Sequence, residues 1–181
     1  YWCHKHHRTC MPTTTAYQFL RRYSLDTIRR LEEFATLRTD AQVIVKHADS
    51  RYAELPPIDG VITSPPYVGL IDYHEQHRYA FELLGLEQHT EAEIGSARQG
   101  NSTNAQREYR EGIAQVFQRA LQSMPQGGPL IIIAGDKYHL YDEIARLCGV
   151  EVEAVIKRHV NRRTGRRSTE FYEDVFIWRK A

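Results

Sequence analysis

The 181-residue sequence has no long apolar run, few cysteines and no excess of either charge. Its longest apolar segment, Leu130–Ala134, is far shorter than the roughly 20 residues that cross a bilayer, so we expect no membrane partner. The 3 cysteines are too few for a disulfide framework, and their odd number favours a reducing, cytoplasmic location. Because 24 Lys and Arg face 23 Asp and Glu, any affinity for nucleic acid must come from local clusters.

The sequence begins Tyr-Trp-Cys, with neither Met nor a signal-peptide pattern, so we expect it to be part of a larger protein. Its length and its 41% hydrophobic content fit one domain over residues 1–181, with a His- and Cys-rich segment over residues 1–15. The spacing within this segment fits no common zinc finger, so we predict no metal site; a partial site completed by another segment is the alternative. The residues concerned are Cys3, His4, His6, His7 and Cys10.

Apolar periodicity and turn residues predict an α/β order of elements. Helices are predicted over residues 16–37, 74–84, 105–123 and 140–148. Strands are predicted over residues 41–48, 60–63 and 130–134, with a closing hairpin of residues 152–160 and 171–179. Strands that alternate with helices indicate a parallel sheet, to which the hairpin adds an antiparallel end. Residues 88–104 are predicted to be irregular.

The predicted strand at residues 60–63 runs directly into Ser64-Pro65-Pro66-Tyr67. Open α/β sheets bind ligands at the carboxyl ends of their strands. Two prolines remove two N–H donors and stiffen the loop, so that its carbonyls meet no competing donor. The amino group of a nucleobase is a poor nucleophile, because its lone pair is delocalised into the ring. Acceptors around both of its N–H bonds, such as the Ser64 hydroxyl and the following carbonyl, would free that lone pair, and Tyr67 could stack on an extruded base.

This loop resembles the catalytic loop of the amino-group DNA methyltransferases, which reads (Asp, Asn or Ser)-Pro-Pro-(Tyr or Phe). The resemblance extends over about residues 41–178. Asp49 and Ser50 end the preceding predicted strand, where the family often places an acid near the adenosine of its cofactor. Gly127 and Gly128 precede the next buried strand, as is usual in the family.

The resemblance implies a Rossmann-like S-adenosylmethionine-dependent methyltransferase sheet that ends in an antiparallel β-hairpin. It implies that Ser64, Pro65, Pro66 and Tyr67 are catalytic and that Asp49 and Ser50 bind S-adenosyl-L-methionine. The substrate would be DNA, and the Ser form of the loop favours N4 of cytosine over N6 of adenine. An RNA or protein amino-methyltransferase, and a silent subunit that only binds nucleic acid and a partner, are the alternatives.

The Phe-x-Gly-x-Gly loop with which the family binds its cofactor is absent, since no pair among the 11 glycines has that spacing. The first strands of the sheet and this loop are therefore expected in an upstream subunit or segment, which would be a partner of the present chain. We accordingly expect the chain alone to bind S-adenosyl-L-methionine weakly or not at all.

Tyr73 and His74 follow the loop closely and are predicted to line the pocket of the base. The alternative is that they only begin a helix that Asp72 caps. Asp136 follows a buried strand at the same sheet edge, where it faces the cleft or caps the helix at Leu140. Cys148 lies in an apolar stretch and is predicted to pack rather than react.

Positive charge gathers in the predicted hairpin. Six basic residues fall within eleven positions with no acid among them: Lys157, Arg158, Arg162, Arg163, Arg166 and Arg167. Such a hairpin tip can reach phosphates and release counterions, so Arg162, Arg163, Arg166 and Arg167 are predicted to bind the DNA backbone. A solvated loop, or pairing of these arginines with Glu170, Glu173 and Asp174, is the alternative.

Overall fold

The computed structural model describes residues 2–3, 7–9, 16–160 and 171–181. The chain divides into two compact units, Tyr1–Lys46 and His47–Ala181, and each is described by itself. The single domain expected over residues 1–181 stays a prediction. Among the described residues, no helix has both the length and the apolar character needed to span a membrane.

The first unit contains a short antiparallel pair and one long helix. Strands β1 (Trp2–Cys3) and β2 (Arg8–Thr9) pair with each other. Helix α1 (Tyr17–Ala35) confirms the helix predicted over residues 16–37, and none of its residues is buried. Its apolar residues are therefore largely exposed, among them Tyr17, Leu20, Tyr23, Ile28, Leu31 and Phe34.

The strand predicted over residues 41–48 is wrong, because the structure assigns no strand there. Val43, Ile44 and Val45 are mostly exposed, Val45 at 90%. β-Branched side chains favour extended backbone, but a strand also needs a neighbouring strand that takes up its N–H and C=O groups. Among the described residues, none pairs with this segment.

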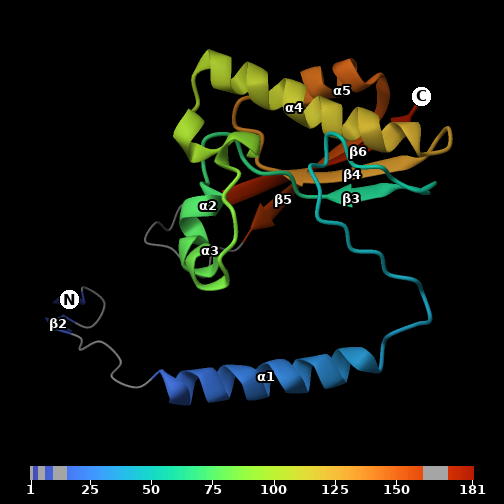
Figure 1. Cartoon of the computed structure of the whole chain (residues 1–181). Coiled ribbons are helices and arrows are strands. Elements are labelled where there is room, and N and C mark those ends of the chain that lie inside the picture. Colours follow the sequence, from blue (N-terminus) through green and yellow to red (C-terminus); the bar gives the residue numbers. More distant parts are fainter. Residues whose placement is uncertain (1, 4–6, 10–15, 161–170) are drawn as a thin grey trace. The chain divides into compact units, whose positions relative to one another are not determined.

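The second unit is built on a mixed sheet of four strands in the order β3-β4-β6-β5. These are β3 (Val61–Thr63), β4 (Pro129–Ala134), β5 (Val150–Val160) and β6 (Phe171–Lys180). β3 and β4 are parallel, and β6 runs antiparallel to both of its neighbours. The predicted α/β class and the closing hairpin are confirmed, while parallel pairing in the described sheet is limited to β3 and β4 (Figure 1).

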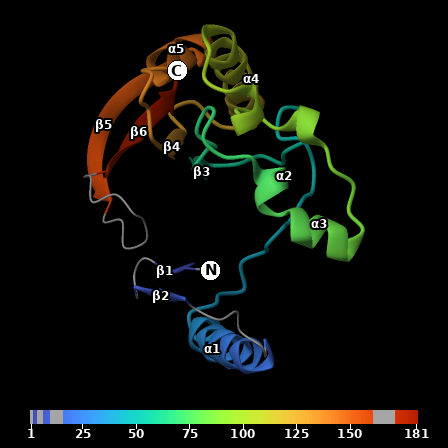
Figure 2. The ribbon, with the colours of Figure 1, turned by 90° about the vertical axis from the view of Figure 1, so that its left-hand side faces the viewer.

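The hairpin continues past the end of β4. The last residue of β4, Ala134, is opposite Asp174 of β6. β5 and β6 go on to pair Arg158 with Glu173, His159 with Tyr172 and Val160 with Phe171. The two long strands can be followed side by side in Figure 2.

Helices α4 (Thr103–Gln122) and α5 (Tyr141–Cys148) cover one face of this sheet (Figure 1). Side chains of β4 alternate in burial, so that Leu130, Ile132 and Ala134 face the core. Aromatic rings join the layers: Phe117 of α4 meets Trp178 edge-on at 5.8 Å, and Tyr141 of α5 stacks on Phe176 at 4.7 Å. Cys148 packs against this core, as predicted.

The predicted helix over residues 74–84 is split into α2 (Tyr73–Gln76) and α3 (Arg78–Leu84). The break is at His77, whose φ of −105° and ψ of 15° leave the helical region. Both helices follow the loop after β3 (Figure 1). Residues 88–102 contain only the 3₁₀ turns η1 (Thr90–Ala92) and η2 (Ala97–Gln99), as expected for an irregular stretch, whereas residues 103–104, also predicted to be irregular, are the first residues of α4.

Candidate active site

The second unit has a cavity of about 690 Å³ at the carboxyl end of β3. Pockets of roughly 300–1,000 Å³ are typical of small-molecule sites. The cavity brings together three parts of the sequence that were predicted to act in one site: Asp49 and Ser50, Ser64 to Pro66, and His74. Its other polar and apolar lining residues include His47, Thr63, Glu87, His89, Glu93, Ile94, Ile113, Val116 and Phe117.

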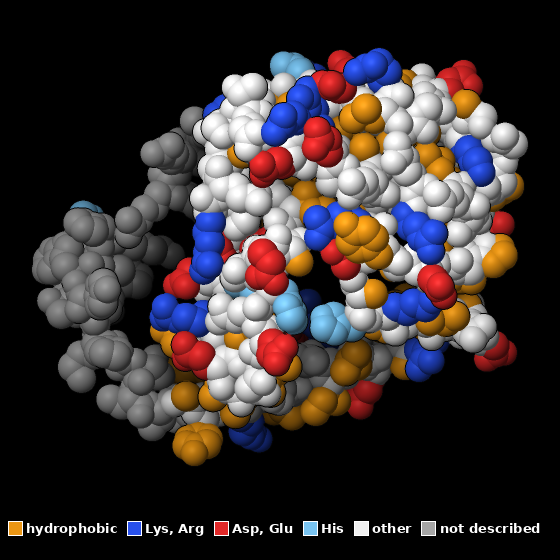
Figure 3. Space-filling model, turned by 45° about the horizontal axis from the view of Figure 1, so that its top comes forward, with side chains coloured by type: hydrophobic (Ala, Val, Ile, Leu, Met, Phe, Trp, Pro, Cys, Tyr) orange, Lys and Arg blue, Asp and Glu red, His pale blue; other side chains and the backbone are white. Residues whose placement is uncertain are grey.

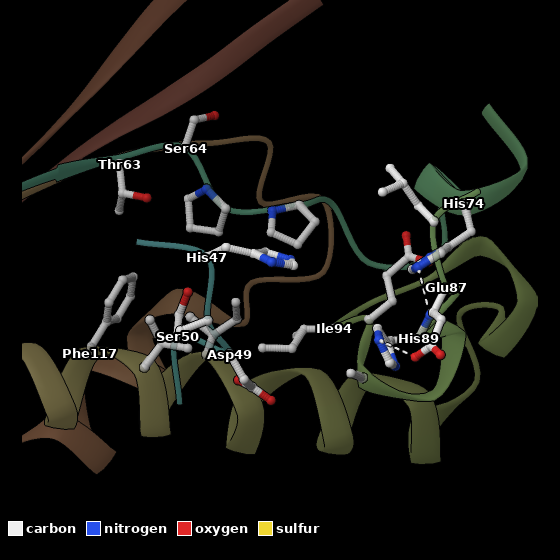
Figure 4. A pocket seen from close by; sticks show the side chains of 18 of the residues that line it. His47, Asp49, Ser50, Thr63, Ser64, His74, Glu87, His89, Ile94 and Phe117 are labelled. Atoms are coloured by element: carbon white, nitrogen blue, oxygen red, sulfur yellow. Dashed lines mark hydrogen bonds and ion pairs between the residues drawn. The ribbon is translucent and has the colours of Figure 1, made fainter. Parts of the chain in front are cut away.

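Figure 4 shows that Thr63 and Ser64, at the start of the loop, point in different directions. The side chain of Thr63 points toward His47 and the interior of the pocket, which Pro65 and Pro66 also line. The Ser64 hydroxyl points the other way, and Ser64 is exposed. In the space-filling view, histidine side chains lie at the rim of a hollow, with charges of both signs nearby (Figure 3).

Asp49 is held by Arg51, two residues later. The Arg51 side chain donates to both Asp49 carboxylate oxygens, at 2.6 Å from Nη2 to Oδ2, and the Arg51 backbone N–H donates to Oδ1. The hydrogen bonds from the Arg51 side chain lower the pKa of Asp49, against a smaller raising effect of burial. Arg51 also donates to the carbonyl of Ala92, which ties this turn to the segment across the cavity. Asp49 is therefore an ionised, fixed acceptor in the pocket wall.

The loop itself is anchored from α4. The Tyr109 hydroxyl donates to the carbonyl of Pro66 at 2.8 Å and lies 3.0 Å from the hydroxyl of Tyr141. Burial raises the pKa of Tyr109 to about 12 and raises the pKa of Tyr141 as well, so both stay protonated at neutral pH. The loop also needs Gly69, whose φ is +66° and whose Cβ, if present, would lie 2.5 Å from the carbonyl oxygen of Gly100.

Tyr67 lies outside the lining of the cavity. Its ring lies against Gly135, and its hydroxyl donates to Glu173 Oε1 at 2.6 Å. Glu173 Oε2 in turn accepts from Arg158. Burial, and then the hydrogen bond to Glu173, raise the pKa of the Tyr67 phenol. The sequence indicates Glu173 only as a partner of the hairpin arginines, because nothing local links residues 106 positions apart.

His74 is fixed through both ring nitrogens. Its Nε2 accepts from the backbone N–H of His89 at 3.2 Å, so in the neutral ring the proton is on Nδ1, which donates to Glu93 Oε2 at 3.2 Å. Glu93 Oε1 accepts from the N–H of Tyr73. The Tyr73 side chain is outside the cavity lining and stacks with His77. Of the two residues, only His74 lines the cavity, and a role of either residue in binding the base stays a prediction.

Asp72, His74 and Glu93 place ligand-type atoms within 4.8 Å of one another. Each of them is already used by the protein. The Asp72 oxygens accept from the N–H of Glu75 and from Arg98, and the nitrogens of His74 are paired as described above. The cluster is therefore a hydrogen-bond network that joins α2 to residues 89–98. Asp72 caps α2, which confirms the predicted alternative that a helix begins here with Asp72 as its cap.

One further prediction is decided by hydrogen bonds, and another falls on residues outside the described part of the chain. Asp136 accepts from the backbone N–H groups of Leu140 and Tyr141, so it caps the start of α5 as the alternative proposed. Residues outside the described part of the chain include the four arginines predicted to bind DNA, Arg162, Arg163, Arg166 and Arg167, and also His4, His6 and Cys10.

No protein-family model matches the chain. A search of curated proteins finds the type II methyltransferase M.MjaII of Methanocaldococcus jannaschii, 38% identical over 192 residues. The match covers 97% of this chain and 36% of the relative, so this chain spans about a third of the relative's length. The resemblance to methyltransferases drawn from the Ser64–Tyr67 motif is confirmed by this similarity.

Solved structures give more distant likenesses. TTHA0409 of Thermus thermophilus, described as a putative DNA modification methylase, aligns with a TM-score of 0.44 and 17% identity over 74% of this chain and 52% of its own. TrmN from Thermus thermophilus aligns with a TM-score of 0.38 and 15% identity over 75% of this chain and 28% of its own. Likenesses this remote carry no functional argument.

Proposed function

We propose that this chain, a relative of a type II methyltransferase, is the catalytic part of an enzyme that methylates an exocyclic amino group of a DNA base with S-adenosyl-L-methionine. One observation carries the proposal: Ser64, Pro65 and Pro66, directly after β3, line a cavity that Asp49 and Ser50 also line. N4 of cytosine is the favoured target, because the loop has Ser at its first position.

The cavity fits the cofactor by its chemistry. Asp49, fixed by Arg51, offers a carboxylate to an amino or hydroxyl group, and Ser50 adds a hydroxyl. Ile94, Val116 and Phe117 give the apolar walls that a purine ring requires. When bound, S-adenosyl-L-methionine supplies an electrophilic methyl group on a sulfonium.

The base would be held by the loop. The exposed Ser64 hydroxyl and the Pro65 carbonyl are the acceptors proposed for the two N–H bonds of the amino group. The Pro66 carbonyl is already bonded to Tyr109, so it fixes the loop rather than the substrate. The Tyr67 ring supplies the stacking surface for an extruded base. Methyl transfer to the activated nitrogen is direct and needs no enzyme nucleophile.

We further propose that a segment or subunit outside this sequence supplies the glycine-rich cofactor loop. Among the described residues, β3 is paired only on its β4 side, and Ile62 in its middle is 77% exposed. A strand added at that edge would pair with the backbone of β3 and extend the sheet next to the pocket, whereas Ile62 points out of a sheet face and would be covered only by a further layer.

The decisive variant is Ser64→Ala. The chain, with the upstream segment if activity requires it, is incubated with radiolabelled S-adenosyl-L-methionine and plasmid DNA, and the digested nucleosides are identified by mass spectrometry. Methylcytosine at N4 is expected from the wild type and from Ser24→Ala, a control on the exposed surface of α1, but not from Ser64→Ala. Detection of methyladenine instead would show that the target base is adenine and not cytosine. An inactive wild type that still binds DNA would favour the silent subunit instead.

A further inference from the structure

The hydroxyl of Tyr67 has a task that base stacking does not explain. Stacking uses only the ring, yet the hydroxyl reaches across to β6 and donates to Glu173 at 2.6 Å. The Glu173 side chain is only 14% exposed, so it is largely withdrawn from water. A phenol and a carboxylate so placed form a short, charge-assisted hydrogen bond.

Glu173 is itself held in place by the hairpin. Arg158 and Glu173 are directly opposite in the β5–β6 register, and Arg158 donates to Glu173 Oε2. The two carboxylate oxygens therefore have different partners, with Tyr67 on Oε1 and Arg158 on Oε2. The hydrogen bonds from Tyr67 and Arg158 lower the pKa of Glu173, so it is ionised at neutral pH.

The other side of the ring is also restricted. A Cβ on Gly135 would be 3.4 Å from the nearest Tyr67 ring atom, which is ordinary van der Waals contact. The ring is thus bounded by the end of β4 and tethered to β6. It comes from a loop whose other anchor, Tyr109 on the Pro66 carbonyl, fixes the backbone but not this side chain.

We infer that Glu173 is a positioning residue of the catalytic loop, which holds the Tyr67 ring in the orientation that stacks on the base. Arg158 orients Glu173 from the strand opposite. This inference rests on the proposed function. It also links the basic hairpin to the loop, since Arg158 is three positions before the first residue of the segment 161–170.

The test compares Glu173→Gln, Glu173→Ala, Tyr67→Phe and the double variant Tyr67→Phe/Glu173→Ala. We expect Glu173→Ala to lower kcat for DNA methylation by about ten- to a hundred-fold, with the KM for the cofactor little changed. Glu173→Gln still accepts a hydrogen bond and should recover part of the loss. The double variant should be no slower than Tyr67→Phe, because both changes remove one tether. Glu153→Ala is the matched control, since Glu153 pairs with Arg179 across the same hairpin and not with the loop.

A second measurement does not depend on methylation. 3-Fluorotyrosine at position 67 is titrated by ¹⁹F NMR, and its phenol should ionise at lower pH in Glu173→Ala than in the wild type. The inference is overturned if this titration does not move, if kcat is unchanged, or if Glu153→Ala slows the reaction as much as Glu173→Ala. If the wild type does not methylate DNA, the proposed function fails, and the fluorine titration alone decides whether the tether exists.

Discussion

Tyr109 connects α4 to the loop that carries Ser64 to Tyr67, and the change Tyr109→Phe removes that connection with little change in volume. A hydroxyl has one proton. Since Tyr109 donates its proton to the Pro66 carbonyl, the contact at 3.0 Å requires that Tyr141 donate to Tyr109. Tyr109→Phe therefore leaves an acceptor and a donor without partners, and Tyr141 is only 2% exposed.

The expected loss of stability follows from the two groups that lose their hydrogen-bond partner, the Pro66 carbonyl and the Tyr141 hydroxyl. A buried polar group that loses its partner costs about 1–3 kcal/mol, and Pro66, being partly exposed, belongs at the lower end. We expect Tyr109→Phe to lower the free energy of unfolding by about 2–4 kcal/mol. Tyr141→Phe leaves only a spare acceptor on Tyr109 and should cost about 1 kcal/mol.

The measurement is urea unfolding followed by tryptophan fluorescence, which reports on Trp178 in the core beside Phe117 and Tyr141. The control is Tyr138→Phe. In the wild type the Tyr138 hydroxyl accepts a hydrogen bond from the exposed Asn101 amide. At about 2–4 °C per kcal/mol, Tyr109→Phe should lower Tm by roughly 5–15 °C. A cost for Tyr109→Phe no larger than that for Tyr138→Phe would refute the proposed anchoring of the loop.

Three further results are expected. Because the folded-state pKa of Glu173 is below its usual 4.5, the stability it contributes is present above that pH and is lost on acidification; urea midpoints between about pH 5 and pH 3 should fall less in Glu173→Gln than in the wild type. Ile132→Ala should cost about 2–5 kcal/mol in urea unfolding, since Ile132 is 0% exposed, and Ile131→Ala on the less buried face should cost less; equal costs would contradict the assigned core. Replacing Arg162 and Arg163 with Gln should weaken DNA binding evenly across sequences and reduce the slope of log K against log salt by about 2, whereas a loss confined to one sequence would indicate base contacts.

The elements with their own periodic pattern could be predicted from the sequence. The predicted bounds of α4 and β4 lie within two residues of the observed ones, because buried side chains recur every third or fourth residue in the helix and every second residue in the strand. The placement of Ser64 to Pro66 beside Asp49 agrees with the resemblance, although the strand over residues 41–48 that was expected to carry Asp49 to the sheet edge is not formed.

What the sequence could not supply is contact between distant segments. The extended run at Val43–Val45 has strand propensity but no strand beside it among the described residues, so propensity alone misled. The Tyr67–Glu173 bond depends on the β5–β6 register and on the path of the loop together, and neither is encoded locally. Tyr73 and His74 are neighbours in sequence, yet the start of α2 sends only His74 into the cavity.

The paired part of β5 and β6 beyond Ala134 extends the sheet past the end of β4. Three cross-strand pairs, from Arg158–Glu173 to Val160–Phe171, span about 10 Å at roughly 3.3 Å per residue. Successive side chains of a strand point to opposite faces, so inserting or deleting one residue in each strand would reverse every side chain that follows. Inserting two residues in each strand would keep the side chains that follow on their original faces and would lengthen the strand pair by about 7 Å. The paired strands beyond Ala134 therefore form a spacer whose length can change only in steps of two residues if the pairs that follow are to keep their faces.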